Sequence, residues 1–367
     1  MAFSIPKYTP PDFTEARFKR CPLVTFEKVN AAGIAPENYH ATSIYPEYLQ
    51  IRKGDWELLT ESRMDCVIVL KGDQSLEARE FRRLEVGDLV ACGRGESGED
   101  GIFVHTEGFE FPEHVMGKFS FRTHLTRETS FSIDYDELYA LLEYERKNGF
   151  ILWVLGPAVA FDRDARDAFS GLVKGGFVHA LLAGNALAVH DIEGALFGTA
   201  LGQDIYSKER MPLGHYQHLD AINRVKATGS IEEAVRQKLV QHGIMRALIT
   251  NRVPFVLAGS IRDDGPLPEV IADAYQAQDA MRAFARRATT VIAMATQLHA
   301  IATGNMVPSY QVLGKNKVRP VYFYTVDMSE FAVSKLLNRG SLTARSIITN
   351  VQDFVVTVER GLRKRQP

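Results

Sequence analysis

The sequence predicts an α/β protein: a mainly-β N-terminal domain followed by a C-terminal domain with a doubly wound parallel sheet. Two observations support this fold class. In the first half, short apolar runs alternate with Gly-Asp turns, which is typical of a small barrel or sandwich. From Phe150 onward, near-continuous apolar runs alternate with helical patterns, which is typical of parallel strands covered on both faces.

The change of pattern near Ile133 predicts the domain boundaries. Residues 1–132 are expected to form the mainly-β domain, residues 133–149 a connecting helix that ends at Asn148-Gly149, and residues 150–367 the parallel-sheet domain. The strands expected in the first domain are Tyr48–Ile51, Cys66–Leu70 and Leu89–Cys92. Those expected in the second are Ile151–Leu155, Val178–Leu182, Pro254–Leu257, Thr290–Ala295, Val321–Tyr324 and Ser346–Ile348.

Composition restricts the class of protein. The 367 residues are 46% hydrophobic and 24% charged, with a formal net charge of −2, so the chain is expected to be globular and not to bind nucleic acid. The three cysteines, Cys21, Cys66 and Cys92, are too scattered for a disulfide framework or a zinc site, and no metal is expected. No segment resembles a signal peptide or a membrane span, which favours a cytoplasmic protein without a membrane partner.

Small and polar residues follow several of the predicted strands. In open parallel sheets, ligands bind beyond the carboxyl ends of the strands, at the crossover point. Asn185 and Ala186 follow one strand, and Thr296 and Gln297 follow another. Both pairs occupy positions where a helix begins and where backbone N–H groups can bind phosphate. A simple helix cap would also explain Asn185.

Asp327 comes shortly after the predicted strand Val321–Tyr324. A carboxylate at such a strand end usually binds the 2′-hydroxyl of an adenosine ribose and repels a 2′-phosphate, which favours NAD over NADP. A cap for the helix expected at Ser329–Leu337 explains Asp327 equally well. No G-x-G-x-x-G motif follows Ile151–Leu155, so the strongest marker of an ordinary dinucleotide fold is missing.

Two groups of ionisable residues are candidates for chemistry. His190, Asp191 and Glu193 interrupt an otherwise apolar segment, where a buried structural histidine is the competing interpretation. Arg262, Asp263 and Asp264 directly follow the strand Pro254–Leu257. Arg262 could clamp a carboxylate and the aspartates could transfer protons, although a solvated turn would explain Asp264 and the glycine and proline after it.

Long runs of the sequence resemble one known family. They are LLAGNALAVHDIE (181–193), GHYQHLDAINRVKATGSI (214–231), VPFVLAGSIRDDGPLPEVI (253–271), QDAM (278–281) and LHAIATGNMVP (298–308), with YHATSIYPEYLQIRKGDWELL (39–59) and MDC (64–66) in the first half. These runs are similar to the archaeal-type ornithine cyclodeaminases, also labelled LOR/SDH conserved-region proteins. The sequence departs from that family in having Asn350 where Asp is common, and in a longer, more basic segment at Ser309–Arg319.

The resemblance implies a Rossmann-like NAD-binding domain of the deoxyhypusine-synthase type, and conversion of L-ornithine to L-proline and ammonia with recycled NAD. It also implies a homo-oligomer with a small amino-acid substrate. The NAD contacts that it implies are Asn185, Ala186, Asp264, Thr296, Gln297, Leu298, His299, Asp327, Asn350 and Val351.

The catalytic hypothesis combines these residues. We expect Arg262 to clamp the substrate, Asp263 or Asp191 to transfer protons with His190 as a relay, and Cys66 of the β domain to help close the pocket. A buried structural thiol is the commoner role for such a cysteine. Two alternatives remain open: an enzyme acting on another diamino acid or an imine, such as a lysine cyclodeaminase or imine reductase, and a non-catalytic NAD-binding sensor.

Overall fold

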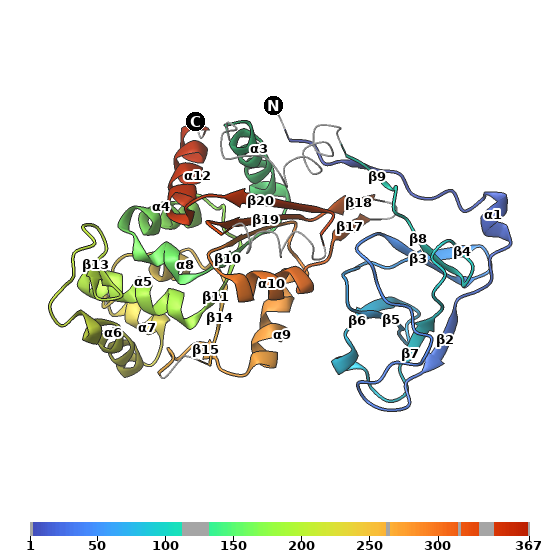
Figure 1. Ribbon diagram of the computed structural model, residues 1–367, viewed down its shortest axis with the longest axis horizontal. Helices are drawn as coiled ribbons and strands as arrows, with labels where there is room; N and C mark the ends of the chain where they lie inside the picture. The colour runs from blue at the N-terminus through green and yellow to red at the C-terminus, as the bar shows by residue number, and fades with distance from the viewer. Residues whose placement is uncertain (1–2, 112–131, 262–264, 315–316, 330–340, 366–367) are drawn as a thin grey trace.

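The computed structural model describes residues 3–111, 132–261, 265–314, 317–329 and 341–365. The N-terminal half contains two antiparallel sheets packed face to face (Figure 1). One sheet has the order β2-β7-β5-β6, with strands Thr25–Lys28, Leu89–Cys92, Val67–Leu70 and Leu76–Arg79. The other has the order β4-β3-β8, with strands Asp55–Leu58, Glu47–Arg52 and Ile102–Val104.

The core of this half lies between the two sheets. Leu49 of β3 and Ile102 of β8 pack against Ile68 of β5 and Ala91 of β7, and all four side chains are fully buried. The predicted strands of the first half are therefore confirmed, and of the two expected architectures they form the sandwich. The short pair β1 (Lys7–Tyr8) and β9 (Phe109–Glu110), helix α1 (Ala16–Lys19) and the 3-10 turn η1 (Phe81–Arg83) complete this half.

The C-terminal half is built on a seven-stranded sheet in which every neighbouring pair is parallel. The spatial order is β15-β14-β11-β10-β16-β19-β20. The strands are Val270–Ile271, Phe255–Ala258, Ala180–Gly184, Ile151–Leu155, Thr290–Met294, Tyr322–Asp327 and Thr343–Ile348. The chain builds outward from β10 in one direction and then crosses to β16 and builds in the other. This is the doubly wound order, with its crossover point between β10 and β16.

Both faces of this sheet are buried, as continuous apolar strands require. Along β10, Ile151, Trp153 and Leu155 pack on one face, while Leu152 and Val154 pack on the other. Helices on the first face are α3 (Ser132–Asn148), α4 (Arg163–Lys174), α5 (Asn185–Phe197), α6 (Gly214–Thr228), α7 (Ile231–Arg236), α8 (Ile244–Thr250) and α12 (Val351–Arg365). The second face is covered by α9 (Ala274–Ala285) and α10 (Gln297–Met306).

The six strands expected in this half are all present, with small shifts at their ends. The largest shifts are at β19, which ends at Asp327 instead of Tyr324, and at β20, which begins at Thr343 instead of Ser346. Strand β11 begins at Ala180 instead of Val178. The ring nitrogen Nδ1 of His179 accepts a hydrogen bond from Ile151 N at 2.8 Å, so pairing with β10 starts only after His179. The helix expected at residues 133–149 is α3, and the proposed domain limits at 132 and 149 stay a prediction.

The basic segment Ser309–Arg319 joins the two halves. It contains the hairpin β17 (Tyr310–Gly314) and β18 (Lys317–Pro320). Ser309 Oγ donates to Ser62 O at 3.1 Å, and the fully buried Tyr310 donates its hydroxyl to Leu59 O. The start of this segment therefore holds the β-rich half against the parallel-sheet half.

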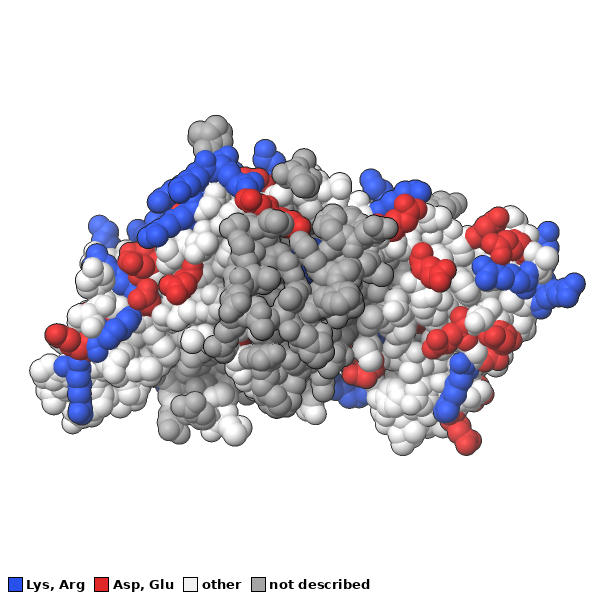
Figure 2. All heavy atoms as spheres, turned by 45° about the horizontal axis from the view of Figure 1, so that its top comes forward, with Lys and Arg blue, Asp and Glu red and all other residues white. Residues whose placement is uncertain are grey.

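Charged side chains of both signs are interspersed on the face shown in Figure 2. Basic side chains are densest near the end of α12, whose last turn carries Arg363, Lys364 and Arg365. Arg365 pairs with Asp136 of α3 at 2.5 Å, and cations at this end complement the helix dipole. None of the helices in the described part of the chain is both long and apolar enough to cross a membrane.

Candidate functional site

The crossover point between β10 and β16 is the centre of the candidate site. Gly156 N, after β10, donates to Met294 O at 2.8 Å, and Ala295 N, after β16, donates to Val326 O at 3.3 Å. A Cβ atom at Gly156 would overlap the carbonyl oxygen of Ala295. Ala295 adopts a left-handed φ of 53°, which is uncommon for a residue other than glycine and often marks a functional turn. The strand ends therefore pack backbone against backbone.

Three helices begin at this edge of the sheet, after β11, β16 and β20. They are α5, α10 and α12 (Figure 1). The first turn of each helix has free backbone N–H groups and the positive end of the helix dipole, which together favour phosphate. The predicted cofactor residues Asn185, Ala186, Thr296, Gln297, Leu298, His299, Asn350 and Val351 all lie in or directly before these first turns, and Asp327 is the last residue of β19.

Asn185 does not cap its helix. Gly184 occupies the cap position without a side-chain hydrogen bond, so the helix-cap explanation for Asn185 is wrong. Instead the buried Asn185 Oδ1 accepts a hydrogen bond from Leu267 N at 3.1 Å. Asn185 thus fixes the loop between β14 and β15 beside the start of α5.

His299 packs over the end of β11. A Cβ atom at Gly184 would lie 2.8 Å from His299 Cε1, so the glycine permits this close approach. Burial lowers the pKa of His299, and its ring is therefore neutral at pH 7. Gln297 and Leu298, which directly precede His299 in the first turn of the same helix, are exposed, and Leu298 is 73% accessible.

The remaining cofactor candidates lie along the same edge, after β19 and β20. Asp327 Oδ1 accepts from Ser329 N at 2.9 Å. Asn350 Oδ1 accepts from Gln352 N at 2.8 Å, as an N-cap of α12. Asparagine and aspartate cap equally well, so the Asn350 departure leaves the helix start unchanged. Arg262, Asp263 and Asp264 lie outside the described residues.

Asp191 has the contacts of a structural carboxylate. Its Oδ1 accepts from Arg166 Nε at 2.9 Å and from Ile244 N at 2.9 Å, and its Oδ2 accepts from Met245 N at 2.8 Å. Arg166 and Asp191 are almost fully buried. A Cβ atom at Gly243, whose φ is 103°, would lie 2.6 Å from Asp191 Oδ1. This geometry favours a role in joining α4, α5 and α8 over the predicted proton transfer by Asp191.

His190 contacts other residues than Asp191 does and is partly accessible. Its Nδ1 lies 2.8 Å from Glu193 Oε2, and Glu193 is completely buried. Glu193 Oε1 also accepts from Thr199 Oγ1 at 3.0 Å. The carboxylate holds Nδ1 as a donor, which leaves Nε2 of His190 as an acceptor. The ring packs edge-on to Phe161 at 5.3 Å, at the end of the η2 turn (Pro157–Phe161) that follows Gly156.

Cys66 is a buried thiol next to the interface of the two domains. Burial raises its pKa to about 11 despite the nearby Arg63 and Arg282. The thiol is therefore protonated at neutral pH, as the commoner structural role requires. Within the described part of the chain, no group of three or more His, Cys, Asp or Glu side chains is arranged to hold a metal ion.

The state of Cys66 leads to a prediction. At pH 7.5 a thiol of pKa about 11 has about 300-fold less thiolate than an unfolded cysteine of pKa about 8.5. Alkylation of Cys66 by iodoacetamide in the folded protein should therefore be slower than in the urea-unfolded chain by at least that factor. Mass spectrometry of the Cys66 peptide over time measures both rates. Similar rates in the two states would contradict this assignment.

The sheet order and the three helix starts at its crossover define the class of the protein: a doubly wound α/β protein with a dinucleotide-type ligand site. Residues 138–358 match the family described as arginine dihydrolase ArgZ-like, C-terminal, Rossmann fold. Ornithine cyclodeaminase of Methanopyrus kandleri is 37% identical over 343 residues, which cover 93% of this chain and 79% of the relative. The chain belongs to the archaeal-type ornithine cyclodeaminase family, as the sequence predicted.

Solved structures support the same assignment. A conserved LOR/SDH protein from Methanococcus maripaludis S2 has a TM-score of 0.81 and 31% identity, with 95% of this chain and 98% of that chain covered. The ternary complex of AgrE with ornithine and NAD+ has a TM-score of 0.58 and 29% identity, and the match covers 95% of this chain and 47% of that one. The predicted fold class is therefore confirmed over both halves of the chain.

Proposed function

We propose that this protein is an NAD-dependent ornithine cyclodeaminase that converts L-ornithine to L-proline and ammonia. The observation that carries the proposal is the convergence of three helix starts on the β10–β16 crossover in a chain 37% identical to enzymes named ornithine cyclodeaminase. The complex of AgrE with ornithine and NAD+ supports the same pair of ligands. The exposed apolar residues Leu213, Tyr216 and Leu219 near the start of α6 support a homo-oligomer.

The residues at the crossover fit a dinucleotide. Gly156 and Gly184 allow the adjacent strand ends to pack closely against Ala295 and His299, and α5 and α10 begin beside them with free backbone N–H groups. A diphosphate is the group that such an arrangement binds best. Asp327 would accept the hydroxyls of a ribose. When bound, NAD supplies hydride acceptance from the α-carbon of ornithine and hydride return to the cyclic imine.

The chain's own groups perform the remaining tasks. Ring closure needs a base for the δ-ammonium group and an acid for the departing ammonia. His190 can do both through Nε2, because Glu193 holds the ring in place through Nδ1. Arg262 is retained as the proposed clamp for the substrate carboxylate and Asp263 as a second proton carrier.

The direct test is turnover of ornithine by the purified protein with NAD in catalytic amount. Proline and ammonia should form in equal quantity without net reduction of NAD. Lysine and 2,4-diaminobutyrate, tested in parallel, separate ornithine from other diamino acids. Binding of NAD without turnover of any diamino acid would remove the proposed reaction and leave the fold assignment intact.

Replacement of His190 by glutamine is expected to lower kcat for ornithine about 100-fold, because the proton carrier is removed. Glu193→Gln should lower kcat less, because His190 keeps its imidazole but loses the carboxylate that orients the ring. Steady-state kinetics from pH 6 to 10 measure both effects. His215→Gln, at an exposed position on α6, is the matched control and should keep the wild-type profile. A profile unchanged in Glu193→Gln would show that the carboxylate is only structural.

A further inference from the structure

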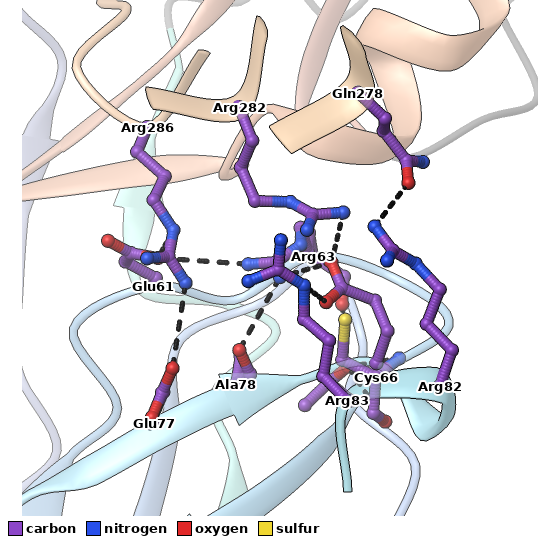
Figure 3. A network of polar contacts seen from close by, with 12 residues as sticks. Glu61, Arg63, Cys66, Glu77, Ala78, Arg82, Arg83, Gln278, Arg282 and Arg286 are labelled. Carbon is purple, nitrogen blue, oxygen red and sulfur yellow. Dashed lines mark hydrogen bonds and ion pairs between the residues drawn. The ribbon is translucent and has the colours of Figure 1, made fainter. Parts of the chain in front are cut away.

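A cluster of arginines lies between the β domain and helix α9 (Figure 3). We call this group the interface cluster; its arginines are Arg63, Arg82, Arg83, Arg282 and Arg286, and its carboxylates are Glu61, Glu77, Glu80 and Asp279. The first three arginines come from the β domain, and the last two come from α9 and its C-terminal end. Figure 3 shows their guanidinium groups turned toward one another across the interface.

Glu80 is the centre of the interface cluster. Its Oε1 is 2.8 Å from Arg63 Nη2 and 2.5 Å from Arg282 Nη2, and its Oε2 is 3.7 Å from Arg83 Nε. Asp279 in turn pairs with Arg82 and Arg83. Each carboxylate is therefore shared, and five guanidinium groups face four carboxylates. The other arginine nearby, Arg79, pairs with both Glu77 and Asp88 at 2.7 Å. Counted with Arg79 and Asp88, the ion pairs of the described residues join six guanidinium groups to five carboxylates.

The two most buried arginines have unused donors. The side chains of Arg63 and Arg282 are 1% and 5% accessible. Nε and Nη1 of both groups have no hydrogen-bond acceptor among the described residues. The nearest carboxylate oxygens to the two Nη1 atoms are Glu61 Oε2, 3.7 Å from Arg63, and Asp279 Oδ1, 3.5 Å from Arg282. A buried donor without an acceptor is costly, and more so when it is charged. Burial, with Arg63, Arg82 and Arg83 nearby, lowers the pKa of Arg282 against the opposing effect of Glu80.

We propose that the interface cluster binds a small oxyanion, a carboxylate or a phosphate group, between Arg63 and Arg282. An oxyanion would neutralise the excess charge and accept from the unused N–H groups, in the geometry that guanidinium groups favour. Water could satisfy the donors but would leave the charge uncompensated. The site joins the two domains, because Arg63 belongs to one and Arg282 to the other.

This site is separate from the crossover edge. Helix α9 follows β15, and its N-terminal end is fixed by Asp273, whose side chain accepts from Gln276 N. Arg282 lies eight residues into the helix, about 12 Å along its axis at 1.5 Å per residue. The proposed anion would hold the β domain against α9, independently of the reaction proposed for the cofactor site.

Calorimetric titration of the NAD-saturated protein tests the proposal. Bound NAD occupies the diphosphate site, so added phosphate reports only on other sites. Inorganic phosphate and acetate are titrated separately at constant ionic strength, with chloride as the reference. We expect saturable binding of one anion per chain. If the natural ligand carries a phosphate group, phosphate should bind more tightly than acetate. If the natural ligand carries a carboxylate, acetate should bind more tightly. Absence of saturable binding by either anion would overturn the proposal.

Variants locate the bound anion. Arg282→Gln and Arg63→Gln should each weaken binding at least tenfold. Arg236→Gln, at an exposed residue of α7 paired with Glu233, is the matched control and should bind as wild type. If neither interface variant folds, phenylglyoxal labelling of the wild-type protein decides: the bound anion should protect Arg83 and Arg286 but not Arg236. If the folded variants bound the anion as tightly as wild type, the anion would not lie between Arg63 and Arg282. Equal labelling with and without the anion would likewise refute this site.

Discussion

Replacement of Asp191 by asparagine is expected to lower the free energy of unfolding by about 3–5 kcal/mol, the usual effect of leaving one partner of a buried ion pair without its counter-charge. Arg166 would remain 1% accessible without a carboxylate. The substitution also replaces one acceptor oxygen with an NH₂ group, which is a donor. In one orientation this group would face the donor Met245 N, and in the other it would face the donors Ile244 N and Arg166 Nε. Urea unfolding followed by circular dichroism measures the change.

Asp220→Asn on α6 is the matched control, because Asp220 is exposed and its neutralisation should change stability by less than about 0.5 kcal/mol. The experiment also separates the two roles proposed for Asp191. A structural carboxylate predicts a large loss of stability, with kcat reduced only as far as the folded fraction falls. A stable variant with a large loss of kcat would restore Asp191 as the proton carrier.

The strands and the functional edge were predictable because they depend on local sequence. A strand that is buried on both faces is apolar at every position, so its limits are visible in the sequence. The limits predicted for β10, Ile151–Leu155, are therefore the observed ones. The edge followed from topology alone, since every parallel strand delivers its next loop to the same side of the sheet. The same argument placed Asn185, Thr296 and Asp327 together without any knowledge of their contacts.

The roles of individual side chains at this edge were not predictable, because they depend on partners distant in sequence. Asp191 pairs with Arg166, 25 residues earlier, and with the start of α8, more than 50 residues later. Asn185 binds the backbone of Leu267, 82 residues away. The His190–Glu193 pair was easier to predict, since residues three apart on a helix are neighbours and Glu193 is one of the three ionisable residues in this apolar segment.

The glycines at this edge have another role than those of a G-x-G-x-x-G motif. That motif places several glycines in one turn so that backbone and diphosphate can approach each other. Here Gly156 follows β10 and Gly184 ends the adjacent strand β11. A Cβ atom at Gly156 would meet the backbone of Ala295 and one at Gly184 would meet the side chain of His299, so these glycines allow close packing within the protein.

Gly156→Ala is expected to have the largest effect on cofactor binding. Its Cβ would overlap the backbone carbonyl of Ala295 and come within 3.2 Å of Thr296 Cβ. Backbone cannot rotate away as a side chain can, so the ends of β10 and β16 must separate. Inserting an atom into such a packed position costs about 1–3 kcal/mol of stability. We expect NAD affinity to fall at least tenfold, measured by fluorescence titration of the folded variant.

A loss of NAD affinity in Gly156→Ala has to be separated from the general effect of adding a methyl group at a glycine. Gly72→Ala, in a β-domain turn where a Cβ would have nothing within 4 Å, should keep wild-type stability and affinity. Gly184→Ala should have an effect on NAD affinity between those of Gly156→Ala and Gly72→Ala, because its Cβ would meet the side chain of His299 and not the backbone. His299 can move, so a smaller loss is expected there. If Gly156→Ala bound NAD as tightly as Gly72→Ala, the cofactor would not lie at the β10–β16 crossover, and the contacts assigned to α5 and α10 would have to be abandoned.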